Sequence, residues 1–99
     1  MKPHEELRRA AQIIREQGWA RGTFQDYCGR VCISGACGVA IHGLAMMGMS
    51  TQAMLFFYQA CNEYPTRFND VMCLCEDDAA AALEIAADLA TPSPGDETC

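Results

Sequence analysis

Cysteine is the residue type in this sequence whose number and spacing could support chemistry. The chain has 99 residues, and seven are cysteines. Thiolates bind zinc and related metals, so a metal site is one use for them. Its ligands would be Cys28, Cys32, Cys73 and Cys75. The Cys-x3-Cys and Cys-x-Cys spacings of this set differ from the Cys-x2-Cys pairs of zinc knuckles. The sequence therefore favours thiols that pack as small apolar residues, with a metal-binding or redox-responsive module as the alternative.

A catalytic cysteine is the second chemistry to consider. Cys32 precedes a predicted helix start, a position that lowers the pKa of a thiol. A cysteine enzyme also needs a base and a group that orients this base. His42 lies ten positions further along and His4 lies near the N-terminus. No histidine is placed for Asn69 and Asp70 to orient, so we expect both to bond backbone groups, including the free amides of a helix start. We expect no enzymatic activity and no cofactor.

The sequence contains a long uncharged stretch, which the rest of the fold must bury. Residues 31–62 contain no Lys, Arg, Asp or Glu, which favours burial. Within it, Val31–Gly48 predicts the start and body of a central helix, with Ser34 as its N-cap. Glycines inside this helix, among them Gly38 and Gly43, predict close contact with a neighbouring helix. The four glycines of the segment also make a buried helix a better account than a membrane span.

Apolar periodicity, together with start and stop signals, predicts three further helices. The first spans Pro3–Gln17 and is ended by Gly18. Another spans Gln52–Tyr64 and is ended by Pro65. The last starts near Glu76–Asp78 and reaches about Ala90. We expect the second and third helices to form an apolar hairpin that the first and last helices cover.

The connections complete the expected fold. Asp at position 26 and Gly at position 29 predict a β-turn, and so an irregular or hairpin-like segment after the first helix. The stretch 66–75 reads as a connection with a short helical turn starting at Asp70. We therefore expect an all-α, compact four-helix domain over residues 1–90 and a flexible C-terminal tail over residues 91–99.

Charge is unevenly distributed along the chain. The net charge is −6. Six basic and four acidic residues give residues 1–30 a balance of +2, whereas one basic and nine acidic residues give residues 63–99 a balance of −8. We expect the two ends to attract each other and no nucleic acid to bind. A line of acidic residues on the last helix is either a solvated face or a binding site for a basic partner. It consists of Asp77, Glu84 and Asp88.

Targeting signals and cysteine usage indicate a compartment. The N-terminal residues MKPHEELRRA show no apolar leader. An odd number of cysteines without such a leader favours free thiols in a reducing cytoplasm. We expect a cytoplasmic protein that does not associate with a membrane.

Several short motifs carry a resemblance to a known group of proteins. These are Gly18-Trp19, then Gly29-Arg30-Val31-Cys32, then Gly35-Ala36, and finally Phe68-Asn69-Asp70 before the last helix. With them the chain resembles a family of small uncharacterised proteins of actinobacteria and their phages, in which the last motif is often Trp-Asn-Asp. The resemblance covers roughly residues 7–90. It implies a bacterial or phage cytoplasmic setting and no particular activity.

The third predicted helix contains the best candidate for a binding surface. Leu55 and Phe56 fall on its polar side, and Trp19 or the 71–74 stretch would have to cover them if they are buried. The polar residues around them are Gln52, Gln59 and Glu63. Aromatic and aliphatic anchors ringed by polar residues are typical of protein interfaces. We therefore expect a non-enzymatic cytoplasmic protein-interaction or regulatory protein. Its partner would be another protein, such as the bacterial host protein of a phage, or a second copy of the chain.

Overall fold

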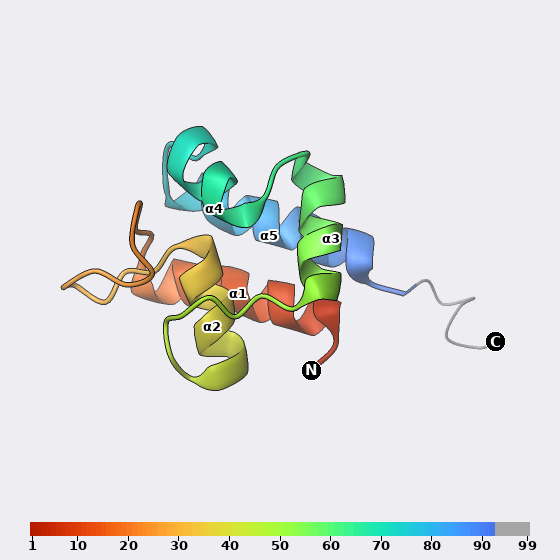
Figure 1. Ribbon diagram of the computed structural model, residues 1–99, viewed down its shortest axis with the longest axis horizontal. Coiled ribbons are helices and arrows are strands. Elements are labelled where there is room, and N and C mark those ends of the chain that lie inside the picture. The colour runs from red at the N-terminus through yellow and green to blue at the C-terminus, as the bar shows by residue number, and fades with distance from the viewer. Residues whose placement is uncertain (93–99) are drawn as a thin grey trace.

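Two long helices from opposite ends of the sequence lie side by side in the computed structural model, which describes residues 1–92 (Figure 1). They are α1 (Pro3–Gln17) and α5 (Glu76–Ala90). Both have the bounds expected from the sequence, because each has a clear apolar face and clear end signals. Leu7 and Ile14 of α1 and Leu83 of α5 are fully buried.

Ion pairs join the outer edges of α1 and α5. Arg8 pairs with Asp88 at 3.0 Å, and Arg15 pairs with Glu84 at 2.8 Å and with Asp77 at 3.0 Å. Because low residue numbers pair with high ones, the two helices are antiparallel. The expected attraction between the ends of the chain is confirmed. The acidic line of α5 already pairs with arginines of α1, which weakens its interpretation as a binding site for a basic partner.

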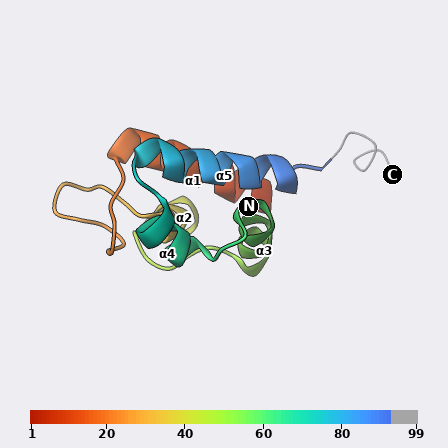
Figure 2. The same cartoon turned by 90° about the horizontal axis from the view of Figure 1, so that it is seen from above.

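The other helices form a second layer across one face of the α1–α5 pair (Figure 2). They are α2 (Ile33–His42), α3 (Thr51–Cys61) and α4 (Pro65–Arg67), which continues as a π-helical stretch, η1 (Phe68–Met72). Over the described residues the fold is thus all-α and compact, with five α-helices and no strand; the expectation of four helices was wrong. The expected α2–α3 hairpin at the centre was also wrong, because the α1–α5 pair occupies that place.

Helix α2 is shorter than expected and has different caps. Cys32, not Ser34, is the N-cap, and its Sγ accepts a hydrogen bond from the Gly35 N–H at 3.2 Å. Gly43 adopts φ 77° and ends the helix, with its N–H bonded to the Val39 carbonyl. A left-handed residue at the C-terminus is a common use of glycine. The segment 43–50 is therefore a loop and not a continuation of the helix.

Helix α3 also ends early, and this explains the extra helix. Asn62 adopts a left-handed conformation with φ 56° and ends α3 three residues before Pro65. Tyr64, the expected last residue of this helix, therefore lies outside α3 and is exposed. Pro65 occupies the first turn of α4, where its missing N–H is not needed. One proline thus marks a helix start here, not the end of the preceding helix.

The segment between α1 and α2 is hairpin-like, as expected. The Gly29 N–H donates to the Asp26 carbonyl at 3.1 Å, which confirms the predicted turn. The Asp26 carboxylate accepts from the Cys28 and Arg30 amides and pairs with the Arg30 side chain at 2.6 Å. Single bridges connect Val31 to Trp19 and Gln25, and the turn projects from one end of the molecule (Figure 1).

The remaining expectations concern the C-terminus and the membrane. Positions 93–99, which include Cys99 and most of the expected tail, lie outside the described residues. Among residues 1–92, no helix combines the length and the apolar character that a membrane crossing requires.

Candidate functional site

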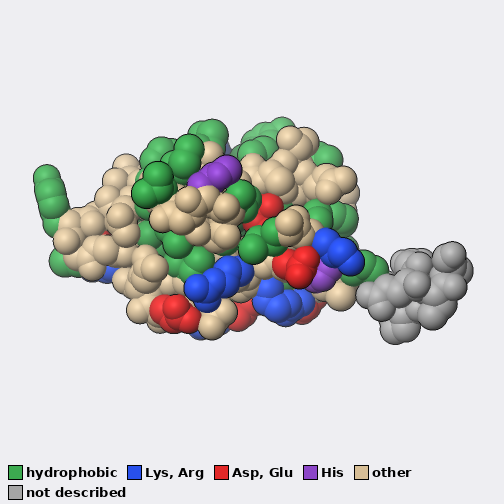
Figure 3. Space-filling model, turned by 90° about the horizontal axis from the view of Figure 1, so that it is seen from below, with side chains coloured by type: hydrophobic (Ala, Val, Ile, Leu, Met, Phe, Trp, Pro, Cys, Tyr) green, Lys and Arg blue, Asp and Glu red, His purple; other side chains and the backbone are tan. Residues whose placement is uncertain are grey.

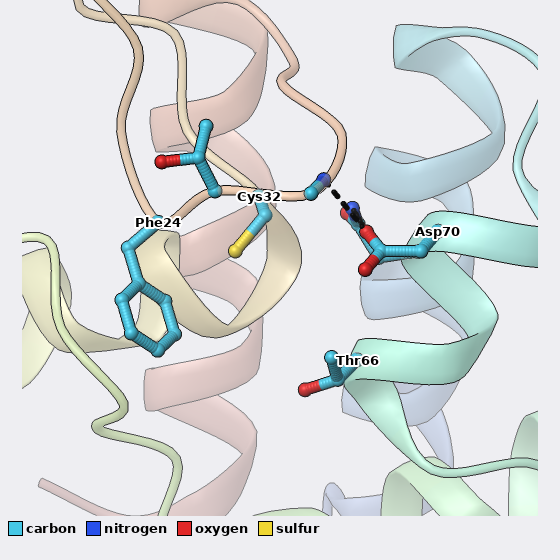
Figure 4. Close-up of a pocket in the computed structure, with 7 residues that line it drawn as sticks. Phe24, Cys32, Thr66 and Asp70 are labelled. Carbon is cyan, nitrogen blue, oxygen red and sulfur yellow. Dashed lines mark hydrogen bonds between the residues drawn. The ribbon is translucent and has the colours of Figure 1, made fainter.

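The structure contains a cleft where three segments distant in sequence meet (Figure 4). The loop after α1 forms one wall, α4 and η1 form the other, and the start of α2 forms the floor. The cleft has a volume of about 330 Å³ and is lined by Gly22, Thr23, Phe24, Cys32, Thr66, Asn69 and Asp70. Several of these residues belong to the motifs that carry the family resemblance.

Asn69 holds the three segments of the cleft together. Its side chain is only 1% exposed. Its Oδ1 accepts from the Trp19 indole Nε1 at 2.8 Å and from the Ile33 amide at 3.0 Å. Its Nδ2 donates to the Ala20 carbonyl at 3.1 Å and to Asp70 Oδ1 at 2.9 Å. All four hydrogen-bonding positions of the amide are filled. Since Ile33 is the first residue of α2, the predicted role of bonding helix-start amides is confirmed.

Among the described residues that line the cleft, Asp70 alone has a formal charge. Its Oδ1 accepts from Asn69 and also from the Gly22 N–H at 2.9 Å. Within residues 1–92 no Lys, Arg or His nitrogen forms an ion pair with it, and Oδ2 has no hydrogen bond. The predicted helical turn starting at Asp70 begins earlier, at Pro65. Asp70 thus brings to the cleft a negative charge that has no ion-pair partner among residues 1–92.

Cys32 lies at the floor of the cleft and is not activated. Burial raises the pKa of its thiol, although the hydrogen bond from the Gly35 amide opposes this effect. The expectation that the helix start lowers this pKa was wrong, because desolvation outweighs the amide contribution. His42 is exposed at the opposite end of α2. Cys32 therefore has no histidine base in this helix.

The four cysteines of the alternative metal site lie in different environments. Cys28 and Cys75 are exposed, and Cys32 and Cys73 are buried. Across the part of the chain that the structure describes, no group of three or more His, Cys, Asp or Glu side chains is arranged to hold a metal ion. Burial raises the pKa of Cys73 to about 12. Burial likewise raises the pKa of Cys61 to about 11.

Only part of the binding surface predicted on α3 is exposed in the structure. Leu55 is 59% exposed and lies between the exposed Gln52 and Gln59. Phe56 is partly buried and packs against the core. Glu63 lies beyond the end of α3 and pairs with Arg67 at 3.1 Å. Leu55 and the two glutamines therefore form an open surface, whereas Phe56 contributes mainly to folding.

Sequence reasoning missed an exposed apolar group in the loop between α2 and α3. It consists of Leu44, Met46 and Met47, all of which had been assigned to a buried helix. On the face drawn in Figure 3, apolar side chains and a histidine lie across one half, and charged side chains gather along the opposite edge. Interpreting Gly43 as a helix end would have revealed the loop.

Comparisons with other proteins identify a family but no function. A family model described as a family of unknown function matches residues 1–89 and so spans nearly all five α-helices. No curated protein matches the chain, and no solved structure does.

Proposed function

The chain belongs to DUF6197, a family of unknown function, and we propose that it is a protein-interaction domain without enzymatic activity. The observation that carries this proposal is an uncharged, partly apolar outer surface on the second layer. We call this surface the uncharged face. It consists of Leu44, Met46, Met47, Gln52, Leu55 and Gln59.

The direction of Leu55 places it on the outside of the molecule. Ala53 and Phe57 of α3 are fully buried. Two residues along an α-helix rotate by about 200°, so Leu55 points about 160° away from each of them. The loop after α2 lies in the same layer as α3 (Figure 2). Its Met47 is 64% exposed. Exposed apolar groups on both segments are typical of an interaction site.

The chemistry of the uncharged face fits a protein partner. Methionine side chains are flexible and polarisable, so they adapt to different apolar surfaces. Glutamines beside a leucine provide the polar surroundings found at interfaces. The net charge of −6 opposes nucleic-acid binding. A thiol without a neighbouring histidine base does not favour cysteine catalysis.

The biological setting is part of the same proposal. The sequence motifs point to actinobacteria and their phages, so we infer that the partner is a bacterial protein and that the domain acts in the cytoplasm. Free thiols at all six described cysteines agree with a reducing compartment. A phage-encoded domain would use the uncharged face to bind a host protein.

Substitutions on the uncharged face test this proposal. Leu55→Gln combined with Met47→Gln should keep the melting temperature of the wild type, because both side chains are exposed. The wild type should capture a specific protein from an actinobacterial lysate. Calorimetry with this purified protein should then show at least tenfold weaker binding by the double variant. Including Phe56→Ser would confuse the test, since Phe56 also packs against the core.

Leu74→Gln is the matched control for this experiment. Leu74 is 81% exposed and precedes α5, outside the uncharged face. This variant should bind as the wild type does. The uncharged face could instead bind a second copy of the chain. In that case, analytical ultracentrifugation would show that the wild type self-associates and that the double variant does not. A captured protein that binds all variants equally, or the absence of both capture and self-association, contradicts the proposal.

A further inference from the structure

We propose that the cleft beside α2 binds a compact organic cation, in which a primary ammonium group is attached to a small apolar body. This inference concerns a different site from the uncharged face and does not depend on the proposed function. It rests on the chemistry of the two walls of the cleft.

The ammonium group would lie at the wall formed by α4 and η1. Asp70 is held in place by two hydrogen bonds to its Oδ1, each 2.9 Å long, from Gly22 and Asn69. Its Oδ2 remains available as an acceptor. The Thr66 side chain extends from the same wall toward the cleft (Figure 4). A carboxylate and a hydroxyl are two of the acceptors that the three N–H groups of a primary ammonium require.

No side chain of the cleft already neutralises Asp70. Burial raises the pKa of Cys32, so its thiol is uncharged at neutral pH. Arg21 is next to Gly22 in sequence, but its guanidinium donates to the Cys73 carbonyl and lies over the Trp19 ring at 5.2 Å. The cleft therefore has a net charge of −1 from its lining residues. This charge favours a cation and disfavours an anion.

The apolar body would lie between Phe24 and Cys32. The Phe24 ring forms the wall opposite Thr66 and Asp70, and the Cys32 sulfur points into the space between them (Figure 4). An aromatic face also attracts a nearby cation. The volume of about 330 Å³ is at the lower end of the range for ligand pockets. The ligand should therefore be small, with about ten non-hydrogen atoms or fewer.

The site is built before a ligand arrives. The hydrogen bonds of Asn69 fix the loop after α1, the start of α2 and η1 relative to one another. The carboxylate of Asp70 is therefore oriented without any loss of side-chain freedom on binding. Such preorganisation improves the affinity of a small ligand.

Benzylammonium is a suitable probe, with the neutral benzyl alcohol as its comparator. Two reporters exist in the protein: the Gly22 amide, which bonds Asp70, and the indole N–H of Trp19, the one tryptophan of the chain. In an NMR titration, both signals should shift saturably with a Kd of about 1 mM. Benzyl alcohol should bind at least tenfold more weakly, because it lacks the charge.

Asp70→Asn is the decisive variant. The asparagine Oδ1 can still accept from the Gly22 amide, so the loop should keep its place while the charge is removed. Binding of benzylammonium should weaken at least tenfold. Asp78→Asn is the matched control: Asp78 also accepts a backbone N–H, that of Leu74 at 2.9 Å, but it lies outside the cleft. This control should bind as the wild type does.

The proposal is overturned by any of three results. Benzyl alcohol could bind as tightly as benzylammonium, Asp70→Asn could bind as tightly as the wild type, or no reporter could shift saturably. If Asp70→Asn fails to fold, Thr66→Val replaces it. Thr66 is exposed, and its hydroxyl lies at the long distance of 3.5 Å from Ser34 Oγ, so its substitution should keep the fold and weaken binding several-fold. Unchanged binding in that folded variant overturns the proposal equally.

Discussion

Asn69 shows how much a single buried amide can organise. It bonds the loop after α1, the first residue of α2 and its own neighbour Asp70; within residues 1–92 no other side chain hydrogen-bonds to all three. A buried polar group is costly unless its partners are in place. The same group therefore stabilises the native arrangement and penalises arrangements that separate these segments.

Asn69→Ala should lower the free energy of unfolding by about 2–4 kcal/mol, because the buried Ile33 amide and Ala20 carbonyl lose their partner. The tryptophan emission should also change, since Trp19 loses its hydrogen bond. Chemical denaturation monitored by fluorescence measures both effects. Asn62→Gly is the control: with φ 56° at this position, glycine fits the backbone and stability should change by less than about 0.5 kcal/mol. Equal stability of Asn69→Ala and the wild type would refute the role of Asn69.

The cysteines should differ in reactivity according to burial. At pH 8, iodoacetamide should label the exposed Cys28 and Cys75 first. Cys61 and Cys73 should react slowly, because pKa values raised to about 11 and about 12 keep their thiols protonated. Their labelling should accelerate only as the pH rises toward these values. Peptide mapping by mass spectrometry measures the order, and rapid labelling of Cys73 in the folded protein at pH 8 would contradict it.

The glycines of α2 lie where neighbouring backbone approaches the helix closely. A Cβ atom at Gly35 would lie 2.2 Å from the Phe24 carbonyl oxygen, and one at Gly38 would lie 2.2 Å from the Met46 carbonyl oxygen. At these two glycines the close neighbours of α2 are thus loops, whereas the sequence had predicted a helix. Gly43 makes no such contact and ends the helix instead. The prediction of close packing was therefore right for Gly38 and wrong for Gly43.

Gly38→Ala should destabilise the protein by about 1–3 kcal/mol, since backbone atoms on both sides would have to move apart. The sign is informative, because glycine-to-alanine substitution inside a helix normally stabilises by about 1 kcal/mol. Thermal or chemical denaturation measures the change. Gly43→Asn should be nearly neutral, because asparagine tolerates the left-handed conformation and nothing lies within 4 Å of the new Cβ. A more stable Gly38→Ala protein would contradict the close contact with the loop.

Local signals decided which elements could be predicted. Helices α1 and α5 each have one apolar face and one charged face, so the sequence predicted where each helix begins and ends. Residues 31–62 have no charged face, so the periodicity that separates helix from loop is missing there. Gly43 was therefore interpreted as a packing residue, and Pro65 was interpreted as a stop instead of a start.

The candidate site could be predicted only in part for a related reason. The types of Asn69 and Asp70 indicated that they would bond backbone groups, but the backbone groups that they bond lie 36 to 49 positions away. Sequence spacing contains no information on such distant contacts. The pKa of Cys32 depended on burial, which only the assembled fold determines.

The ion pairs between α1 and α5 are separated from the exposed apolar surface. Ion pairs lie along the seam of α1 and α5, and the uncharged face lies on the second layer. Arg15 is the central group of the seam, because it pairs with both Glu84 and Asp77. Hydrogen bonds to Glu84 and Asp77 raise the pKa of Arg15 above its ordinary value, which favours its charged form.

Arg15→Gln should lower the melting temperature at low salt, and the difference from the wild type should shrink as NaCl approaches about 1 M, because salt screens exposed ion pairs. Arg9→Gln is the control. Arg9 pairs with Glu16 of the same helix at 3.7 Å and does not reach α5. Its substitution should change the melting temperature less. Equal effects of the two substitutions would show that the seam contributes nothing measurable to holding the helices together.

The pairing of α1 with α5 has a consequence for synthesis on the ribosome. Contacts such as Arg8 with Asp88 and Arg15 with Glu84 join residues 80 and 69 positions apart. Helix α1 is translated well before α5, so its main partner is still missing while most of the chain emerges. Its apolar side chains, including Leu7 and Ile14, remain exposed during that interval and are available to chaperones. Folding can be completed only once α5 has left the exit tunnel, and these distant contacts make that final step slower than local helix pairing would be.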